Sequence, residues 1–221
     1  DWPEPERLAR EKEALGFFIS GHPLDRFRDV VQAYDTVNSR NLQSVAGQKI
    51  ELACVVTSVS RQISKRDNSE WGKIIVEDFH GTATILAFKD AWQAAKDTLE
   101  VDAVVLFRGA VSNRERDEED PPIFLDGVEA LDALPSSGQL SLEIEVAPGG
   151  SLGDEIFAAA RAVLEAHPGP APVELTLGSD NGVKAPRFRS RSLRVDPLGE
   201  TIPELRRIFG TGRVRLVRRG A

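Results

Sequence analysis

The sequence TATILAFKDAWQAAKDTL, residues 82–99, changes its periodicity halfway along. Residues 82–88 are mostly apolar or β-branched and predict a strand, and the turn-forming sequence DFHG at 78–81 comes just before it. Residues 90–99 are rich in alanine and predict a helix, with Asp90 placed to cap its start. The stretch therefore predicts a turn, a strand and a helix in direct succession.

Further strands are predicted on both sides of this stretch. Two precede it, at 49–60 and 72–77, and two follow it, at 103–111 and 123–131. Three strands, one helix and two more strands form the order of an OB-fold, a five-stranded Greek-key barrel. The sequence therefore predicts an OB-fold domain over residues 49–133.

A helical connector segment, residues 1–48, is predicted before the barrel. Residues 6–18 are rich in strong helix formers, and the sequence Gly-His-Pro ends this helix. A second short helix is predicted at 24–34, because its apolar residues recur on one helical face. Residues 35–48 are interpreted as connecting chain.

A second domain, residues 139–219, is predicted after a Pro-, Ser- and Gly-containing linker at 134–138. Its predicted elements are a strand at 139–146, a helix at 151–166, strands at 172–178 and 187–195, a helix at 198–209 and a strand at 213–218. This βαββαβ order matches the ferredoxin-like split βαβ plan. The whole chain is thus expected to be α+β and mainly β.

Composition narrows the class of protein. The chain has 221 residues, of which 41% are hydrophobic and 29% charged, so it can form folded cores. No apolar run approaches the roughly 18–20 residues that a membrane helix needs. The single cysteine, Cys54, lies in an apolar run and is interpreted as a small core residue in a reducing compartment. We therefore expect a cytoplasmic protein without membrane contact, and the start at Asp1 indicates part of a longer chain.

Charge is distributed unevenly along the chain. The net charge is -7, yet residues 181–221 contain 11 Lys+Arg and 3 Asp+Glu, a local charge of +8 that leaves -15 for the remainder. Such asymmetry indicates faces that meet different partners. Arginines alternate with other residues at 187, 189 and 191, and they suit an acidic partner or phosphates. The alternative is that they are solubilising charges that balance the acidic barrel.

The segment between the first two predicted strands of the barrel gathers positive charge beside an aromatic ring. In OB-folds this loop commonly frames the site for single strands, where cations meet phosphates and flat rings stack on bases. The candidate DNA-binding residues are Arg61, Lys65, Arg66, Trp71 and Lys73. Phe79 and Phe88 could also stack on bases, but phenylalanines on strands are more often core, and we expect them there. The alternative for the charged segment is a solvated loop.

The predicted barrel is acidic as a whole. Residues 49–133 contain 10 Lys+Arg and 17 Asp+Glu, and phosphate affinity depends on the number of contacting cations. We therefore expect weak DNA binding that becomes useful when the barrel is tethered beside other DNA contacts. The alternative function is a module that binds proteins only.

No catalytic, metal-binding or cofactor-binding motif is recognised in the sequence, and no cofactor is expected. Glu77 and Asp78 are adjacent on a strand, so their carboxylates point apart, and Asp78 is expected to set the turn before Gly81. The chain is not expected to be a tRNA synthetase with an OB domain, because the roughly 90 residues after the barrel are too few for the catalytic core of such an enzyme.

The sequence EKEALGFFISGHPL, residues 11–24, carries the most specific resemblance. It resembles the segment E-K-E-x-L-G-[FL]-Y-[LI]-[ST]-G-H-P-[LI] that precedes the OB domain in alpha subunits of bacterial DNA polymerase III, with Phe18 in place of the usual Tyr. VEDFHG at 76–81 and ILAF at 85–88 are similar to the family's L-E-D-x-x-G turn and V-x-[VL]-F strand. Residues 193–210 resemble the family's last domain more loosely.

This resemblance implies a non-catalytic part of a DNA-directed DNA polymerase, a nucleotidyltransferase whose palm domain lies upstream. It implies that the OB domain handles single-stranded template and that the last domain attaches to the tau subunit of the clamp loader. The implied setting is the cytoplasmic, nucleoid-associated replisome, with the rest of the polymerase and the sliding clamp as further partners. The candidate residues for binding tau are Leu205, Arg206, Ile208 and Phe209.

Overall fold

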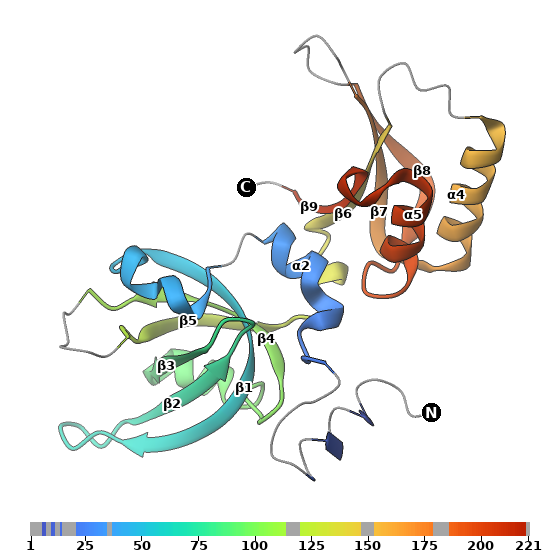
Figure 1. The fold of residues 1–221 in the computed structure, drawn as a ribbon. Helices are drawn as coiled ribbons and strands as arrows, with labels where there is room; N and C mark the ends of the chain where they lie inside the picture. The colour runs from blue at the N-terminus through green and yellow to red at the C-terminus, as the bar shows by residue number, and fades with distance from the viewer. Residues whose placement is uncertain are drawn as a thin grey trace. The chain divides into compact units, whose positions relative to one another are not determined.

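The structure is a computed structural model that describes residues 6–7, 10–11, 14, 21–34, 37–113, 120–146, 153–178 and 186–219. It divides into two compact units (Figure 1). The first contains Asp1–Arg28 and Asp35–Leu131, and the second contains Asp29–Tyr34 and Asp132–Ala221. Most of the helix predicted at 6–18, and with it most of the motif at 11–24, lies outside the described residues.

The first unit is built on a closed five-stranded barrel in the order β1-β2-β3-β5-β4. Its strands are β1 (Lys49–Ile63), β2 (Glu70–Glu77), β3 (Thr82–Phe88), β4 (Val104–Val111) and β5 (Ile123–Ala130). Neighbouring strands are antiparallel except β3 and β5, which close the barrel as a parallel pair. Helix α3 (Lys89–Ala95) lies between the third and fourth strands, which is the arrangement predicted for an OB-fold.

The side chains that point inward from the strands fill the interior of the barrel. On β2 and β3 every second residue is buried, for example Ile74 and Ile85, so the residues between them face outward. Trp92 of α3 joins this core, and Asp90, predicted to cap the helix, lies inside the first turn instead, because Phe88 occupies the cap position. Cys54 is fully buried, as predicted, and burial raises the pKa of its thiol.

The segment before the barrel is more ordered than predicted. Residues 35–48, interpreted as connecting chain, contain the 3-10 helix η2 (Ser39–Val45). Asp78, which is buried, fixes this helix to the β2–β3 turn: its carboxylate accepts hydrogen bonds from the amide of Ser39 at 2.6 Å and from the amides of His80 and Gly81 at 2.7 and 2.9 Å. The predicted turn-setting role of Asp78 is confirmed.

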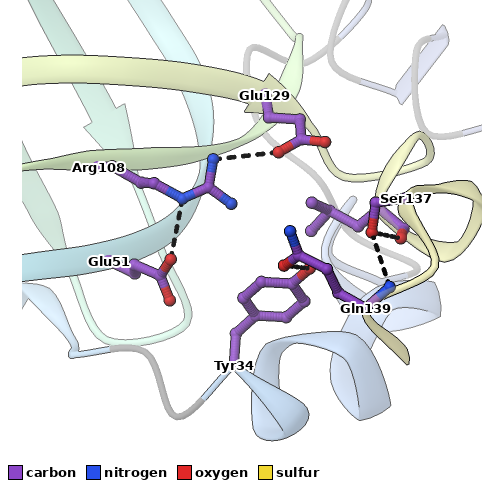
Figure 2. A network of polar contacts seen from close by, with 7 residues as sticks. Tyr34, Glu51, Arg108, Glu129, Ser137 and Gln139 are labelled. Carbon is purple, nitrogen blue, oxygen red and sulfur yellow. Dashed lines mark hydrogen bonds and ion pairs between the residues drawn. The ribbon is translucent and has the colours of Figure 1, made fainter. Parts of the chain in front are cut away.

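The predicted helix at 24–34 is present as η1 (Asp25–Phe27) followed by α2 (Arg28–Ala33). Tyr34, just after α2, is held within the second unit. Its hydroxyl donates to Oε1 of Gln139 at 3.3 Å (Figure 2), and the guanidinium of Arg218 lies 4.4 Å from its ring centre. These contacts explain why Asp29–Tyr34 clusters with residues far along the chain.

The second unit is a four-stranded sheet in the order β8-β7-β6-β9, with two helices packed against each other on one face (Figure 1). Its elements are β6 (Leu140–Val146), α4 (Asp154–Ala166), β7 (Pro168–Leu177), β8 (Arg187–Val195), α5 (Thr201–Phe209) and β9 (Val214–Arg218). The short 3-10 helix η4 (Thr211–Arg213) joins α5 to β9. The sequential βαββαβ order is the predicted one.

The predicted split βαβ plan is wrong. In that plan the third strand of the domain lies between the first and second, whereas β6 and β7 are direct parallel neighbours and β8 lies at the edge. The physical reason is burial: β6 is buried along nearly its whole length, while most of β8 is exposed and carries three alternating arginines. A strand of this kind suits an edge, where charged side chains remain in water.

The predicted linker at 134–138 is also structured. It forms the 3-10 helix η3 (Leu134–Ser137), whose Leu134 and Pro135 are buried, and it ends at Gly138 with a φ of +77°. Burial of two apolar residues makes this stretch part of the second unit's core. Within the described residues, no helix has the length and apolarity to cross a bilayer.

Candidate nucleic-acid interface

The register of the β1–β2 hairpin separates residues that the sequence groups together. Lys73 lies opposite Ser60, and Arg61 lies opposite Gly72. Residues directly opposite each other share a face of an antiparallel pair, and successive residues alternate between faces. Trp71 and Lys73 therefore lie on the outer face of β2, while Arg61 lies on the inner face with Gly72.

Arg61 is also neutralised where it lies. Its guanidinium forms an ion pair with Glu70, which is on the same hairpin. Both side chains are partly exposed, so the pair adds little stability, but it leaves Arg61 with little net charge to offer a phosphate. Arg61 is thus not brought together with Trp71 and Lys73.

Lys65 and Arg66 lie in the turn that joins β1 to β2. The turn is closed by a hydrogen bond from the amide of Ser64 to the carbonyl of Ser69 at 2.9 Å. Hydrogen bonds from Ser69 hold the pKa of the exposed Asp67 below its ordinary value, so this carboxylate is charged and engaged locally. Lys65 and Arg66 are both exposed, and neither forms an ion pair with a described residue. They remain available cations at the end of the hairpin.

Three aromatic rings form a row across the outer face of the barrel. Trp71 of β2 lies directly opposite Phe88 of β3, with ring centres 5.5 Å apart, and the ring of Phe88 lies 6.1 Å from that of Phe124 on β5. Phe88 and Phe124 are 44% and 38% exposed. Lys73 follows on the same face of β2, so this row, here called the aromatic row, has a cation at its side.

The prediction that Phe88 belongs to the core is wrong, because the last position of β3 points outward. Phe79 does not join the row: its ring contacts the ring of His22 at 5.1 Å and lies under the guanidinium of Arg28 at 4.3 Å. Phe124 was missed by the sequence reasoning. Its signal is alternation, since it lies between the buried residues Ile123 and Leu125 of a predicted strand.

The neighbouring part of the barrel surface is occupied by an internal ion triad. Arg108 of β4 donates to Glu51 of β1 at 2.9 Å and to Glu129 of β5 at 3.0 Å (Figure 2). Burial opposes its charged form, but the bonds to the two carboxylates outweigh burial and raise the pKa of Arg108 above its ordinary value. This cation serves the barrel itself, so the candidate interface is built from the aromatic row, Lys73 and the hairpin turn without Arg108.

In the second unit, the four residues predicted to bind a partner lie on α5. Leu205 and Phe209 are buried in the unit's own core, as expected for a helix that packs on its sheet. Arg206 forms a two-pronged ion pair with Asp29. Only Ile208 is neither buried nor engaged in such a pair, so α5 offers a small apolar surface.

Much of the positive charge near the C-terminus is used inside the second unit. Arg215 and Arg187 approach the buried carboxylate of Glu143 at 2.9 and 3.3 Å, and Arg219 pairs with Glu174. Burial alone would raise the pKa of Glu143, but hydrogen bonds from Thr176 and Arg215 and the charges of Arg215 and Arg187 lower it. The arginines named here therefore balance acids of their own unit.

The described residues contain no group of three or more His, Cys, Asp or Glu side chains arranged to hold a metal ion.

No family model matches the chain. Among curated proteins, the DNA polymerase III subunit alpha of Pseudomonas aeruginosa is 28% identical over 224 residues, covering 96% of this chain and 18% of that protein. The subunit alpha of Saccharopolyspora erythraea is 25% identical over 190 residues, covering 83% of this chain and 16% of that protein.

The predicted resemblance to DNA polymerase III alpha subunits is thus confirmed, at low identity and over less than a fifth of the relatives' length. Among solved structures, the SSB domain of a Synechococcus protein has a TM-score of 0.33 and 12% identity, covering 37% of this chain and 92% of that one. The mitochondrial single-stranded DNA binding protein Rim1 from S. cerevisiae also has a TM-score of 0.33 and 12% identity, covering 38% and 95%.

Proposed function

We propose that the barrel binds single-stranded DNA on the aromatic row and the adjoining hairpin turn. The observation that carries the proposal is the aromatic row itself. Its rings Trp71, Phe88 and Phe124 are adjacent, and Phe88 and Phe124 are substantially exposed to solvent, although large apolar rings are usually buried. Bases stack on exposed aromatic rings whatever their identity, at roughly 1–3 kcal/mol per base.

The cations complete the interface in this proposal. Lys73 lies on the same face as the row, and Lys65 and Arg66 extend from the end of the hairpin. Each would neutralise a phosphate of a strand that crosses β2 and β3. Because stacking and phosphate pairing do not depend on the identity of the base, we expect binding to tolerate any sequence.

Binding by the barrel alone is proposed to be weak. Its 17 acidic residues outnumber 10 basic ones over residues 49–133, and Arg61 and Arg108 are occupied by carboxylates. A barrel tethered to another DNA-binding domain needs only modest affinity, because the tether raises the local concentration of the strand.

The similarity to DNA polymerase III alpha subunits suggests the setting of this activity. We propose that the chain is the non-catalytic C-terminal part of such a subunit and that polymerisation takes place elsewhere in the full-length protein. In this proposal the barrel holds single-stranded template near the polymerase cleft. The second unit attaches to the tau subunit of the clamp loader in the cytoplasmic replisome, whose other members include the sliding clamp.

A second candidate function is a replisome module that binds only proteins. The acidic character of the barrel favours it, since phosphates are repelled by a net negative surface. The aromatic row would then be an apolar docking patch. The two candidates differ in what they predict for salt: stacking on DNA comes with phosphate contacts and weakens as salt rises, whereas apolar protein docking does not.

Fluorescence anisotropy with a labelled oligothymidine at low and moderate salt separates the candidates. Phe88→Ala with Phe124→Ala should weaken binding by roughly tenfold to hundredfold, and Lys65→Glu with Arg66→Glu should abolish it at moderate salt. The matched control is Ile63→Ala, which removes a 62% exposed apolar side chain from the inner face of the same hairpin and should change nothing. Absence of binding at low salt would retire the DNA proposal.

A pull-down of separately purified replisome subunits with the chain tests the second part. Retention of tau supports attachment through the second unit. Retention of tau by a variant with Ile208→Asp would show that α5 is not the contact, whereas retention of none of the subunits would contradict the attachment proposal.

A further inference from the structure

Two adjoining hollows lie along β8, which forms the opposite edge of the second unit's sheet from β9. The first is apolar, measures about 360 Å³ and lies between α4 and β8. Its walls include Phe157 and Leu164 of α4, Leu175 of β7, and Phe188 and Leu193 of β8. Phe157 and Phe188 are 44% and 55% exposed, so two large rings border an unfilled apolar space.

The second hollow is cationic. It also measures about 360 Å³, and Arg189, Arg191 and Arg194 line it together with Ser190 and Pro172. It shares Arg189 and Ser190 with the apolar hollow, so the two form one continuous surface. A ligand that lay along β8 would meet an apolar space and a cluster of positive charge side by side.

The acidic residues that the structure describes in this unit form no ion pair with this cluster. Arg189 lies opposite Glu174 in the register of β7 and β8, but Glu174 is paired with Arg219. Arg189 and Arg191 form no ion pair with any described residue, and both are exposed. They differ in this from Arg187, two residues away on the same strand, which approaches Glu143 at 3.3 Å.

The backbone of β8 adds a third feature. The strand is at the edge of the sheet, and no described strand pairs with its outer side. Edge strands commonly protect themselves with charge, and they also accept an added strand from a partner. Successive residues of an added strand point to opposite faces, so an alternating segment could direct apolar side chains toward α4 and acidic ones toward the arginines.

We infer that β8 and α4 form a docking site for an extended partner segment in which apolar and acidic residues alternate. This inference rests on the proposed function, because it gives the place and the chemistry through which the second unit binds a replisome partner. Charge complementarity selects the acidic segment: three arginines line one hollow, and none of the described residues that line either hollow is acidic. A nucleic acid would satisfy the arginines but leave the apolar hollow unfilled.

The test uses the whole chain and a fluorescein-labelled synthetic peptide of alternating Leu and Asp, with matched peptides in which Asp is replaced by Asn or Leu by Ser. Arg189→Glu with Arg191→Glu should weaken binding of the Leu-Asp peptide at least tenfold. The Asn and Ser peptides should bind the unaltered chain as weakly as the Leu-Asp peptide binds the double variant. Arg207→Glu is the matched control, since Arg207 is an exposed arginine of the same unit outside both hollows.

Thermal melting establishes that each variant is folded. The inference is overturned if the Leu-Asp peptide does not bind, if Arg207→Glu weakens it as much as the double change, or if the Asn peptide binds equally well. It is also overturned if oligothymidine, rather than peptide, loses affinity in the double variant.

Tau retention keeps this result separate from the proposed function. If the peptide fails but tau is retained by both the unaltered chain and the double variant, attachment stands and this site is wrong. If the peptide binding and the tau retention are lost together in the double variant, the site and the attachment are both supported.

Discussion

Gly72 of β2 lies directly against the indole of Trp92 on α3. A Cβ built at Gly72 would collide with Cε3 and Cζ3 of this ring, which is buried in the barrel core. The absence of a side chain at position 72 allows the helix to approach the strand that carries Trp71 and Lys73. Packing beneath the candidate interface therefore depends on one glycine.

Gly72→Ala should destabilise the barrel by about 1–3 kcal/mol, because an overfilled core forces the indole or the strand to move. Denaturant unfolding followed by tryptophan fluorescence measures the change. Gly127→Ala on β5 is the matched control, since a Cβ there meets nothing within 4 Å, and it should cost less than about 0.5 kcal/mol. Equal losses in both variants would show that the close approach of Trp92 is not important.

Lys73→Ala and Arg61→Ala should affect oligothymidine binding differently, although the two residues are almost opposite each other on one hairpin. Lys73 lies on the outer face with the aromatic row, so its loss should lower affinity and reduce the slope of log K against log salt by about 0.7. Arg61 lies on the inner face and is paired with Glu70, so its loss should leave the slope unchanged. Equal slopes for the two variants would contradict the assignment of faces.

Glu143 should make the second unit sensitive to acid. Burial raises its pKa, but bonds from Thr176 and Arg215 and the charge of Arg187 lower it below the ordinary value of 4.5. A group with a lowered pKa in the folded state contributes stability above its unfolded pKa and loses it as the pH falls toward the folded one. The contribution is therefore complete at pH 7 and declines below about pH 4.5.

Glu143→Gln should cost about 1–3 kcal/mol at pH 7 and flatten the decline of stability in acid. Urea unfolding at pH 7 and at several values below pH 4.5 measures both effects. The control is Glu165→Gln on α4, whose exposed pair with Arg161 is worth only about 0.3–0.5 kcal/mol. A Glu143→Gln variant with the acid sensitivity of the unaltered chain would place the sensitivity elsewhere.

The barrel strands could be predicted from sequence because β2 and β3 alternate between buried and less buried residues, and β1 and β4 contain short apolar runs. The strand predicted at 82–88 is β3 (Thr82–Phe88), for example. The faces of the β1–β2 hairpin could not be predicted, because β1 contains a bulge between Val56 and Ser58. Even-numbered residues of β1 point inward before the bulge and odd-numbered ones after it, so Arg61 moves to the inner face.

In the second unit the order of elements was predictable, but the order of strands in the sheet was not. Both the split plan and the observed plan have the sequence βαββαβ, and only pairing distinguishes them. A signal was nevertheless present: LSLEIEV at 140–146 is apolar at every second position, whereas RFRSRSLRV at 187–195 carries arginines. Weighing which strand could be surrounded on both sides would have placed β8 at the edge.

The parallel contact between β3 and β5 spans just two residue pairs, Ile85 with Ile123 and Leu86 with Phe124, whereas β1 and β2 share eight. We expect local unfolding of the barrel to begin at this strand pair, so its amides should exchange with deuterium before those of the other pairs. Phe124 belongs to this pair and Phe88 ends one of its strands. A nucleotide stacked on both rings would link β3 to β5. Bound DNA should therefore slow deuterium exchange of the amides between these two strands.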